Sequence, residues 1–307
     1  MGSYRYAFTV VTSAFNRAHT LHRVYESLRA QTCRNFEWLV IDDGSTDNTA
    51  ALVQAWTAQA SFPIRYLRQE NRGKHVACNR AAREALGEFL LNIDSDDACV
   101  PQAIERLKYH WERIPLAERA RFCGVAVLCV DEKGELVGSK FPWDVTDSDS
   151  VEIRYRYKVK GEKWGFIRTD VAREFPFPEP PNVRYVTEAM VFRRIAQKYK
   201  MRYVNEALRI YYCHDSDQTS RLVHSAPRHP ESMHLYLREV LAKDLRWFRY
   251  APVKFLRDAA NYGRFGFDCG VDPLTQATEL RNVWAQLLWF AALPVAYLYH
   301  LRDCRHP

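Results

Sequence analysis

Short apolar runs alternate with segments of helical periodicity over the first 130 residues, and this alternation restricts the possible fold more than any other feature. Between the runs, apolar residues recur every three or four positions, which is typical of amphipathic helices. Strands that alternate with helices predict an open, largely parallel α/β sheet with helices on both faces. The predicted strands cover residues 8–11, 38–41, 64–67, 89–93 and 124–130.

Acidic clusters follow the second and fourth of these strands. Asp42 and Asp43 come directly after the second, and Asp94, Asp96 and Asp97 come after the fourth. Because ligands of such sheets bind beyond the carboxyl ends of the strands, both clusters are expected at a binding edge. Two carboxylates one residue apart can face one Mg²⁺ or Mn²⁺ ion, whose other sites phosphate oxygens and water fill. Acidic turns also occur without any ligand, so each cluster alone leaves that alternative open.

Two further charged residues are candidates for chemistry. Lys74 precedes a predicted helix, where its charge and the helix N-terminus can neutralise a diphosphate. Glu188 lies at the start of a helix predicted over 187–196, where a carboxylate can accept a proton from a hydroxyl as a general base. A solvated lysine and an ordinary first-turn glutamate are the structural alternatives. The sequence has no P-loop and no GxGxxG after the first strand, which disfavours P-loop and dinucleotide-binding enzymes.

Composition excludes other classes of protein. The 307 residues are 47% hydrophobic and 26% charged, which excludes a disordered or fibrous chain. The net charge of +7 is small and scattered, so it does not favour a nucleic-acid partner. The eight cysteines include no CxxC pair and no zinc pattern. With an N-terminus that lacks signal-peptide features, these cysteines predict a cytoplasmic protein.

Residues 216–307 differ in composition and predict long basic and aromatic helices. The apolar run 283–299 contains Gln286 and Pro294 and falls short of the roughly 20 apolar residues of a membrane-spanning helix. Basic and aromatic residues mix at 246–250, which suits a helix in the lipid headgroup region. Two alternatives stay open: this region contacts the inner face of the cell membrane, or it is a helical pair packed on the rest of the protein.

Three ordered motifs resemble family 2 glycosyltransferases, which have the GT-A fold. They are FTVVTSAFNR, EWLVIDDGSTDNT and QENRGKHVACNRAAREALGEFLLNIDSDD. Further on, GEKWGFIRTDVAREFPFPE and YVTEAMVFRRIAQKYKMRYVNEALRIYY resemble the acceptor-side half of one branch of that family. The resemblance implies a GT-A domain over residues 1–215, with a nucleotide-sugar-binding half (1–130) and an acceptor-binding half (131–215). Residues 216–307 would form a helical C-terminal extension.

The resemblance implies a donor site built from five matching residues: Ser13, Phe15, Asp43, Lys74 and Asp94. Asp43 would contact the nucleobase of the donor. Ser13 and Phe15 lie where the loop after the first strand lines the nucleotide site in this family. Lys74 would lie near the diphosphate.

The resemblance also implies the metal ligands and the base. Asp94 would lie near the ribose or the metal, and Asp96 would bind the Mn²⁺ or Mg²⁺ ion that bridges the diphosphate. Glu188 falls where the family places its base, which is usually Asp. His214 lies in a region where relatives carry residues of the acceptor loop.

The expected function is metal-dependent transfer of a sugar, with inversion, from a nucleotide-sugar donor to a hydroxyl. A UDP-sugar is the favoured donor, and a glycan or lipid-linked glycan in cell-envelope polysaccharide biosynthesis is the favoured acceptor. Two alternatives stay open: a nucleotidyltransferase acting on sugar phosphates, and a catalytically inactive sugar-binding scaffold. The first would need a glycine-rich basic loop after the first strand, where TSAFNRAHT has no glycine.

Overall fold

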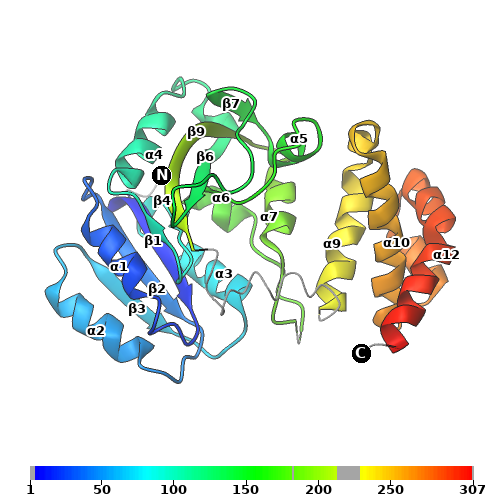
Figure 1. Ribbon diagram of the computed structural model, residues 1–307, viewed down its shortest axis with the longest axis horizontal. Coiled ribbons are helices and arrows are strands. Elements are labelled where there is room, and N and C mark those ends of the chain that lie inside the picture. Colours follow the sequence, from blue (N-terminus) through cyan, green and yellow to red (C-terminus); the bar gives the residue numbers. More distant parts are fainter. Residues whose placement is uncertain (1–3, 182, 213–228, 306–307) are drawn as a thin grey trace. The chain divides into compact units, whose positions relative to one another are not determined.

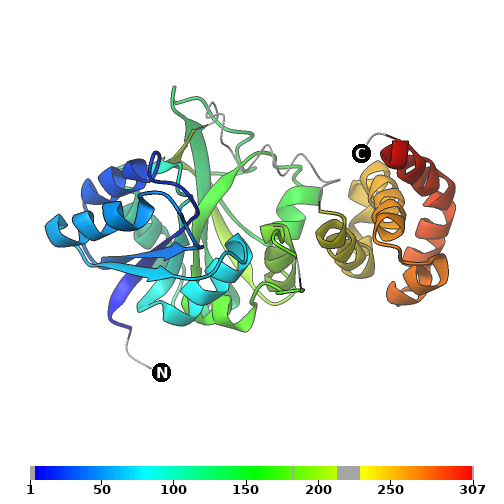
Figure 2. The same ribbon diagram turned by 90° about the horizontal axis from the view of Figure 1, so that it is seen from below.

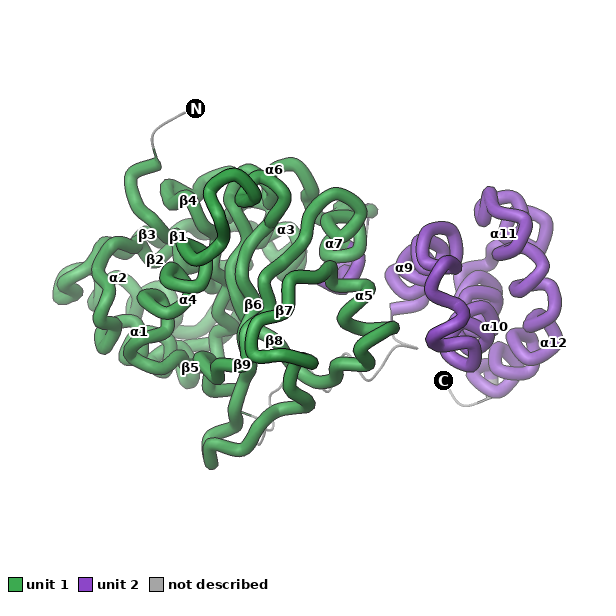
Figure 3. The backbone as a smooth tube through the Cα atoms, turned by 90° about the horizontal axis from the view of Figure 1, so that it is seen from above, with its two compact units in different colours: residues 1–180, 191–215 green, residues 181–190, 216–307 purple. Residues whose placement is uncertain are grey.

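The computed structural model describes residues 4–181, 183–212 and 229–305, and it contains two compact units. Unit 1 comprises residues 1–180 and 191–215, and unit 2 comprises residues 181–190 and 216–307 (Figure 3). Each unit has its own architecture, so the two are described separately.

The described strands of unit 1 form a nine-stranded mixed sheet in the order β3-β2-β1-β4-β8-β6-β9-β5, with β7 paired to β9 (Figure 1). The first four strands in this order are parallel, whereas β8 is antiparallel to both of its neighbours, β4 and β6. The strands are β1 (Tyr6–Ala14), β2 (Phe36–Asp42), β3 (Ile64–Arg68), β4 (Gly87–Asn92), β5 (Ala98–Cys99), β6 (Phe122–Asp131), β7 (Val145–Ser148), β8 (Lys163–Arg168) and β9 (Lys200–Tyr211).

Helices cover both faces of this sheet, which confirms the predicted architecture. Successive strand residues point to opposite faces, so Val10 and Val11 belong to different apolar clusters. Helices α1, α2 and α4 pack on the face of Val10, and α3 and α6 pack on the face of Val11. The helices of unit 1 are α1 (His22–Arg29), α2 (Thr49–Gln59), α3 (Lys74–Glu84), α4 (Ala103–Glu112), α5 (Ser150–Tyr155), α6 (Thr169–Glu174) and most of α7 (Glu188–Ile195).

The register of the parallel strands brings the acidic clusters to one edge of the sheet. Ala14 at the end of β1 lies opposite Asp42 at the end of β2. On the other side of β1, Val11 lies opposite Asn92, the last residue of β4. The segments that follow β1, β2 and β4 therefore leave the sheet at the same edge, as expected for parallel strands.

Unit 2 is helical in its described residues. Figures 1 and 2 show α10 between α9 and α12, and α10 packs on both. Its elements are α9 (Pro230–Lys243), the 3₁₀ helix η3 (Leu245–Tyr250), α10 (Pro252–Asp268), α11 (Pro273–Glu279) and α12 (Val283–Arg305). Proline opens α9, α10 and α11, where its missing N–H costs no hydrogen bond.

Several polar side chains inside unit 2 hydrogen-bond to one another. The Glu279 carboxylate accepts hydrogen bonds from the Tyr262 hydroxyl and the Arg238 guanidinium, each at 3.0 Å. Buried Gln276 accepts a hydrogen bond from Trp289 Nε1 at 3.2 Å, which ties α11 to α12. Among the described helices, none carries a stretch both long and apolar enough to cross a bilayer.

Candidate active site

The loops after β1 and β2 are joined into one structure at the carboxyl edge of the sheet. The Asp43 N–H donates to the carbonyl of Ala14 at 2.8 Å. Asn16 has a φ of +54°, a conformation that asparagine tolerates better than most residues. Its N–H donates to Ser45 Oγ at 2.9 Å, and its Oδ1 accepts from the Thr46 N–H at 2.8 Å.

Ser13 and Phe15 lie at this edge. Ser13 is the penultimate residue of β1 and is half-buried, whereas Phe15 follows the strand with 45% of its surface exposed. An exposed aromatic ring beside a binding edge offers an apolar face to a planar group. The role of both residues in lining the nucleotide site stays a prediction.

Asp43 organises the loop that precedes α3. Its carboxylate is buried, and Oδ1 accepts from Gln69 Nε2 at 2.8 Å and from the Arg72 N–H at 3.1 Å. Oδ2 accepts from the N–H of Gly73 at 2.8 Å. Gly73 has a φ of +99° and is the N-cap of α3, a conformation that favours glycine. Asp43 thereby fixes the chain directly before Lys74, and its contact with a nucleobase stays a prediction.

Replacing Asp43 by alanine is expected to lower the free energy of unfolding by about 1–3 kcal/mol, because buried N–H groups lose their acceptor. The loop that carries Lys74 would also loosen, so nucleotide affinity should fall. Asp149→Ala is a matched control, since Asp149 accepts from the N–H groups of Val151 and Glu152 at the start of α5. Urea unfolding and nucleotide titration check both effects, and equal nucleotide affinity in the two variants would contradict the assignment.

Asp94 joins cations from two different elements. Its Oδ1 accepts from Lys74 Nζ at 2.6 Å, and its Oδ2 accepts from Arg209 Nη2 at 2.6 Å. Burial alone would raise the pKa of Asp94, but the charges of Lys74 and Arg209 hold this pKa below its usual range. The carboxylate is therefore ionised at neutral pH.

Asp96 differs from Asp94 in that no lysine or arginine side chain hydrogen-bonds to its carboxylate within the described residues. The side chain is half-buried. Burial and the charge of Asp94 raise the pKa of Asp96, and the charges of Arg17 and Arg209 oppose this rise without cancelling it, so the ionised form is poorly stabilised as the site stands. A cation at this position would relieve both penalties.

The site fits a divalent cation bound together with a phosphate-bearing ligand. In the described part of the chain, no group of three or more His, Cys, Asp or Glu side chains is arranged to hold a metal alone. Mg²⁺ commonly takes only one or two protein carboxylates and completes its shell with phosphate oxygens and water. Asp96 offers free oxygens for such a cation, whereas both oxygens of Asp94 already accept from cationic side chains.

Arg209 is a site residue that the sequence analysis missed. It lies on β9, is 5% exposed, and its Nε donates to Asp97 Oδ2 at 2.8 Å. The opposite oxygen of Asp97 accepts from the N–H of Tyr212 at 3.1 Å. A lone arginine inside the apolar run ALRIYY was the available signal, since a charge buried in a strand requires a partner.

Glu188 is the first residue of α7 and is exposed. The carbonyl of the preceding residue, Thr187, accepts from the Met190 N–H at 3.1 Å. Glu188 belongs to unit 2, and its partnership with the acidic cluster stays a prediction. His214 lies outside the described residues.

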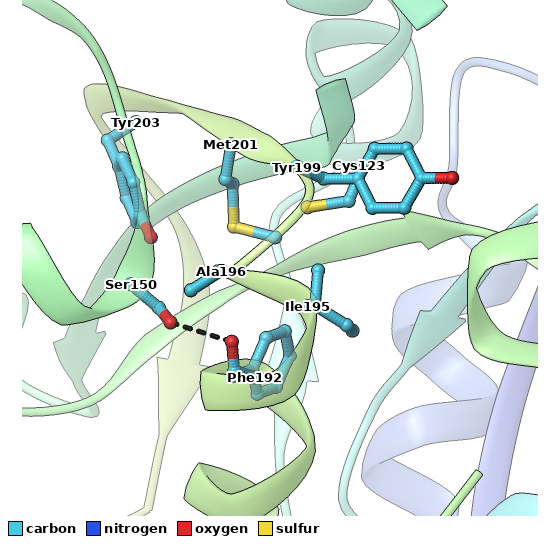
Figure 4. Close-up of a pocket in the computed structure, with 8 residues that line it drawn as sticks. All are labelled: Cys123, Ser150, Phe192, Ile195, Ala196, Tyr199, Met201 and Tyr203. Atoms are coloured by element: carbon cyan, nitrogen blue, oxygen red, sulfur yellow. Dashed lines mark hydrogen bonds between the residues drawn. The ribbon is translucent and has the colours of Figure 1, made fainter. Parts of the chain in front are cut away.

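An apolar pocket of unit 1 contains none of the candidate residues (Figure 4). Its few polar groups include the Ser150 hydroxyl, which donates to the Phe192 carbonyl at 2.9 Å. A lining of this kind offers no charge to a diphosphate, so the acidic edge is the better candidate site. The pocket is lined by Cys123, Ser150, Phe192, Ile195, Ala196, Tyr199, Met201 and Tyr203.

Known proteins resemble this chain in sequence over part of its length and in fold over most of it. An uncharacterized glycosyltransferase of Nostoc sp. is 34% identical over 99 residues, which are 32% of this chain and 31% of that protein. The chain spans between about a fifth and a third of the length of the first curated relatives it matches.

Solved structures are similar over most of the chain. The structure of S. aureus TarS 1-349 in complex with UDP-GlcNAc has a TM-score of 0.60 at 19% identity, covering 94% of this chain and 80% of that one. The mannosyltransferase PcManGT from Pyrobaculum calidifontis, in complex with GDP-Man and Mn²⁺, has a TM-score of 0.54 at 18% identity, covering 98% and 88%. At these identities the likeness concerns the fold, and it agrees with the GT-A fold and the C-terminal helices expected above.

The family model "Glycosyl transferase family 2" matches residues 9–125. This range contains most of β1 and all of β2 to β5 with their loops, and therefore Asp43, Lys74, Asp94 and Asp96. Residues 9–125 of this chain therefore match glycosyl transferase family 2.

Proposed function

We propose that this protein transfers a sugar from a nucleotide-sugar donor to a hydroxyl of a glycan or lipid-linked glycan. A UDP-sugar is the favoured donor, and cell-envelope polysaccharide biosynthesis at the inner face of the membrane is the favoured setting. One observation supports the proposal: the half-buried carboxylate of Asp96, whose pKa burial and Asp94 raise, lies at the same sheet edge as the Lys74–Asp94–Arg209 ion pairs. An anionic ligand that brings a cation suits this combination of charges.

The similar structures support the choice of ligand. TarS was solved with UDP-GlcNAc, and PcManGT was solved with GDP-Man and Mn²⁺. Both ligands of those proteins are nucleoside diphosphate sugars, the class that the charges of this edge suit. In this proposal residues 1–130 bind the donor and residues 131–215 bind the acceptor.

The donor would be held by the loops at the carboxyl edge. Ser13 and Phe15 line the nucleotide, and Asp43 faces the base while it holds the loop before α3. Lys74 stabilises the negative charge that develops on the departing diphosphate. Asp96, with Asp94, would hold Mn²⁺ or Mg²⁺, which supplies further charge neutralisation at the diphosphate.

Glu188 would act as the base on the acceptor side. It accepts the proton of the acceptor hydroxyl as that oxygen attacks the anomeric carbon from the face opposite the diphosphate. A single displacement of this kind inverts the anomeric configuration. No second carboxylate acts as a nucleophile, in contrast to a retaining glycosidase.

Thermal unfolding with nucleotides tests the proposal. UDP, GDP and dTDP are each added with and without Mn²⁺ to the wild type and to Asp96→Ala. At a nucleotide concentration about 100 times Kd, one nucleotide should stabilise the wild type by about 2.7 kcal/mol, only when metal is present. Asp96→Ala should abolish this gain, because the metal loses its ligand.

The control for this experiment is Asp144→Ala, which removes an exposed carboxylate outside the acidic cluster. That variant should respond to nucleotide as the wild type does. A shift that needs no metal and survives in Asp96→Ala would refute the metal assignment. If no nucleotide shifts the wild type, the catalytic proposal fails and a sugar-binding scaffold becomes the better interpretation.

A further inference from the structure

One side of α12 is apolar and exposed from Val283 to Leu298. The large hydrophobic side chains on this side are between 43% and 71% exposed. Ala285, Trp289, Ala292 and Ala296 are buried and lie on the opposite side of the helix, at the 3.6-residue period. We call the exposed side the apolar face of α12; it comprises Val283, Trp284, Leu287, Phe290, Val295, Tyr297 and Leu298.

Basic residues lie just beyond both ends of this face. No Asp, Glu, Lys or Arg occurs between Arg281 and Arg302, and both arginines are exposed. Arg302 follows Trp284 by five helical turns, so it lies on the same side of α12. Trp284 and Tyr297 are both exposed on this face. Exposed aromatic side chains flanked by basic residues are typical of a lipid–water interface.

The exposed charges of unit 2 are predominantly positive. Within residues 229–304 six basic side chains are exposed, against only the acidic pair Glu231 and Asp272. Other carboxylates are used internally: Glu279 pairs with Arg238, and Asp303 with Arg264. An anionic surface therefore complements this unit. The exposed basic residues are Lys243, Arg246, Arg249, Arg257, Arg281 and Arg302.

We propose that the apolar face of α12 docks on the surface of an anionic lipid bilayer, with the helix lying in the headgroup region. The face runs for about 24 Å at 1.5 Å per residue, which is long enough to bury a continuous apolar stripe along the membrane plane. The inference rests on the proposed function, because a lipid-linked acceptor is presented at such a surface.

A second copy of the chain is a poorer occupant for this face. Antiparallel pairing of two α12 helices would place Arg281 of one copy beside Arg302 of the other, and parallel pairing would place each arginine beside itself. Either arrangement brings like charges together at both ends of an apolar contact, which is unfavourable. An anionic membrane instead attracts every one of these arginines.

Vesicle flotation of the full chain tests the proposal without donor or acceptor. The wild type should float with vesicles of phosphatidylcholine mixed with phosphatidylglycerol and bind more weakly to phosphatidylcholine alone. The double variant Leu287→Ser, Phe290→Ser should bind at least about tenfold more weakly, because it removes apolar area from the interface. Arg281→Gln should weaken binding to the mixed vesicles about fivefold.

The matched control is Leu116→Ser, which removes an 80% exposed leucine from unit 1 and should leave vesicle binding unchanged. All variants change exposed side chains, so their melting temperatures should equal that of the wild type. Lipids with brominated acyl chains provide a second readout. They should quench tryptophan fluorescence in the wild type and do so less in Trp284→Phe, since Trp284 would lie among the chains.

Two outcomes would overturn the proposal. One is the absence of flotation, or flotation that the α12 variants leave unchanged. The other is a concentration-dependent dimer, measured by sedimentation, that dissociates in the double variant while the wild type binds no lipid. The nucleotide-induced thermal shift should be unchanged in every α12 variant, so a failure of lipid binding is distinguishable from a failure of the proposed transferase function.

Discussion

Replacing Glu188 by glutamine is expected to lower kcat by about 10²–10⁴-fold, the usual contribution of a general base. Glutamine keeps the size of the side chain but has no basic oxygen to accept the proton of the acceptor hydroxyl. Donor binding should be unchanged, because the donor is assigned to residues of unit 1. Sugar transfer measures the first effect, and the nucleotide-induced rise in melting temperature measures the second.

Glu118→Gln is the control for this variant. Glu118 is also exposed, and in the sequence it lies far from the motif that contains Glu188. Its turnover should equal that of the wild type. Retained turnover in Glu188→Gln would contradict the assignment of Glu188 as the base. Loss of both turnover and donor binding would place Glu188 in the donor site or in the folding of unit 2.

Replacing Arg209 by methionine is expected to destabilise the protein by about 3–5 kcal/mol, the cost of removing one partner from a buried ion pair. Asp97 is 1% exposed and would lose the cation that compensates its charge. Asp94 would retain Lys74 as its only described cation partner. Chemical denaturation measures the loss, and Arg209→Met, Asp97→Asn should recover part of it, because the double variant leaves no unpaired charge at that position.

The destabilisation by Arg209→Met should also depend on pH. Burial raises the pKa of Asp97 to about 6 even though Arg209 opposes this effect, so removing Arg209 should raise that pKa further. The folded state then holds a proton that the unfolded state releases above its ordinary pKa near 4. Stability of the variant should therefore fall as pH rises toward the folded-state pKa of Asp97.

A control on the same strand separates burial from pairing. Arg202, also on β9, pairs with Asp147 at 2.7 Å, but the Asp147 side chain is 32% exposed. Arg202→Met should cost less than Arg209→Met, about 1 kcal/mol and with little dependence on pH, because water can solvate the partly exposed Asp147 once its partner is lost. Equal losses for the two arginine variants would show that Asp97 does not depend on Arg209 for its charge.

The sequence predicted those parts of the structure that local periodicity and parallel pairing determine. Alternating strands and helices placed Asp43 and Asp94 at one sheet edge, because the carboxyl ends of parallel strands coincide. The Lys74–Asp94 ion pair, 20 residues apart in sequence, agrees with that placement. Arg209 could not be placed in this way, since its contact with Asp94 joins residues 115 positions apart and depends on the order of strands in the sheet.

Other features depend on packing that a single sequence does not reveal. Asp43 was predicted to contact a nucleobase, whereas its hydrogen bonds to the loop before α3, which bury its carboxylate, were not predicted. For residues 216–307 the sequence left a membrane contact and a packed helical pair as alternatives. In the structure α12 packs on α10 with one side and exposes apolar residues on the other, which hydropathy averaged along the chain does not separate.

Strand β8 lies outside residues 9–125, the segment that matches the family model, yet it contributes to the core of the parallel strands. Phe166 of β8 packs on both Phe8 and Phe89 of the parallel strands, with ring centroids 5.2 and 4.6 Å away. A fragment ending at residue 125 would lose this aromatic side chain and also Arg209, the ion-pair partner of Asp97. It would leave the edge of β4 unpaired, and an unpaired edge strand favours aggregation. The segment that matches the family model therefore ends before the sheet is complete, and a protein truncated at residue 125 would lack β7, β8 and β9.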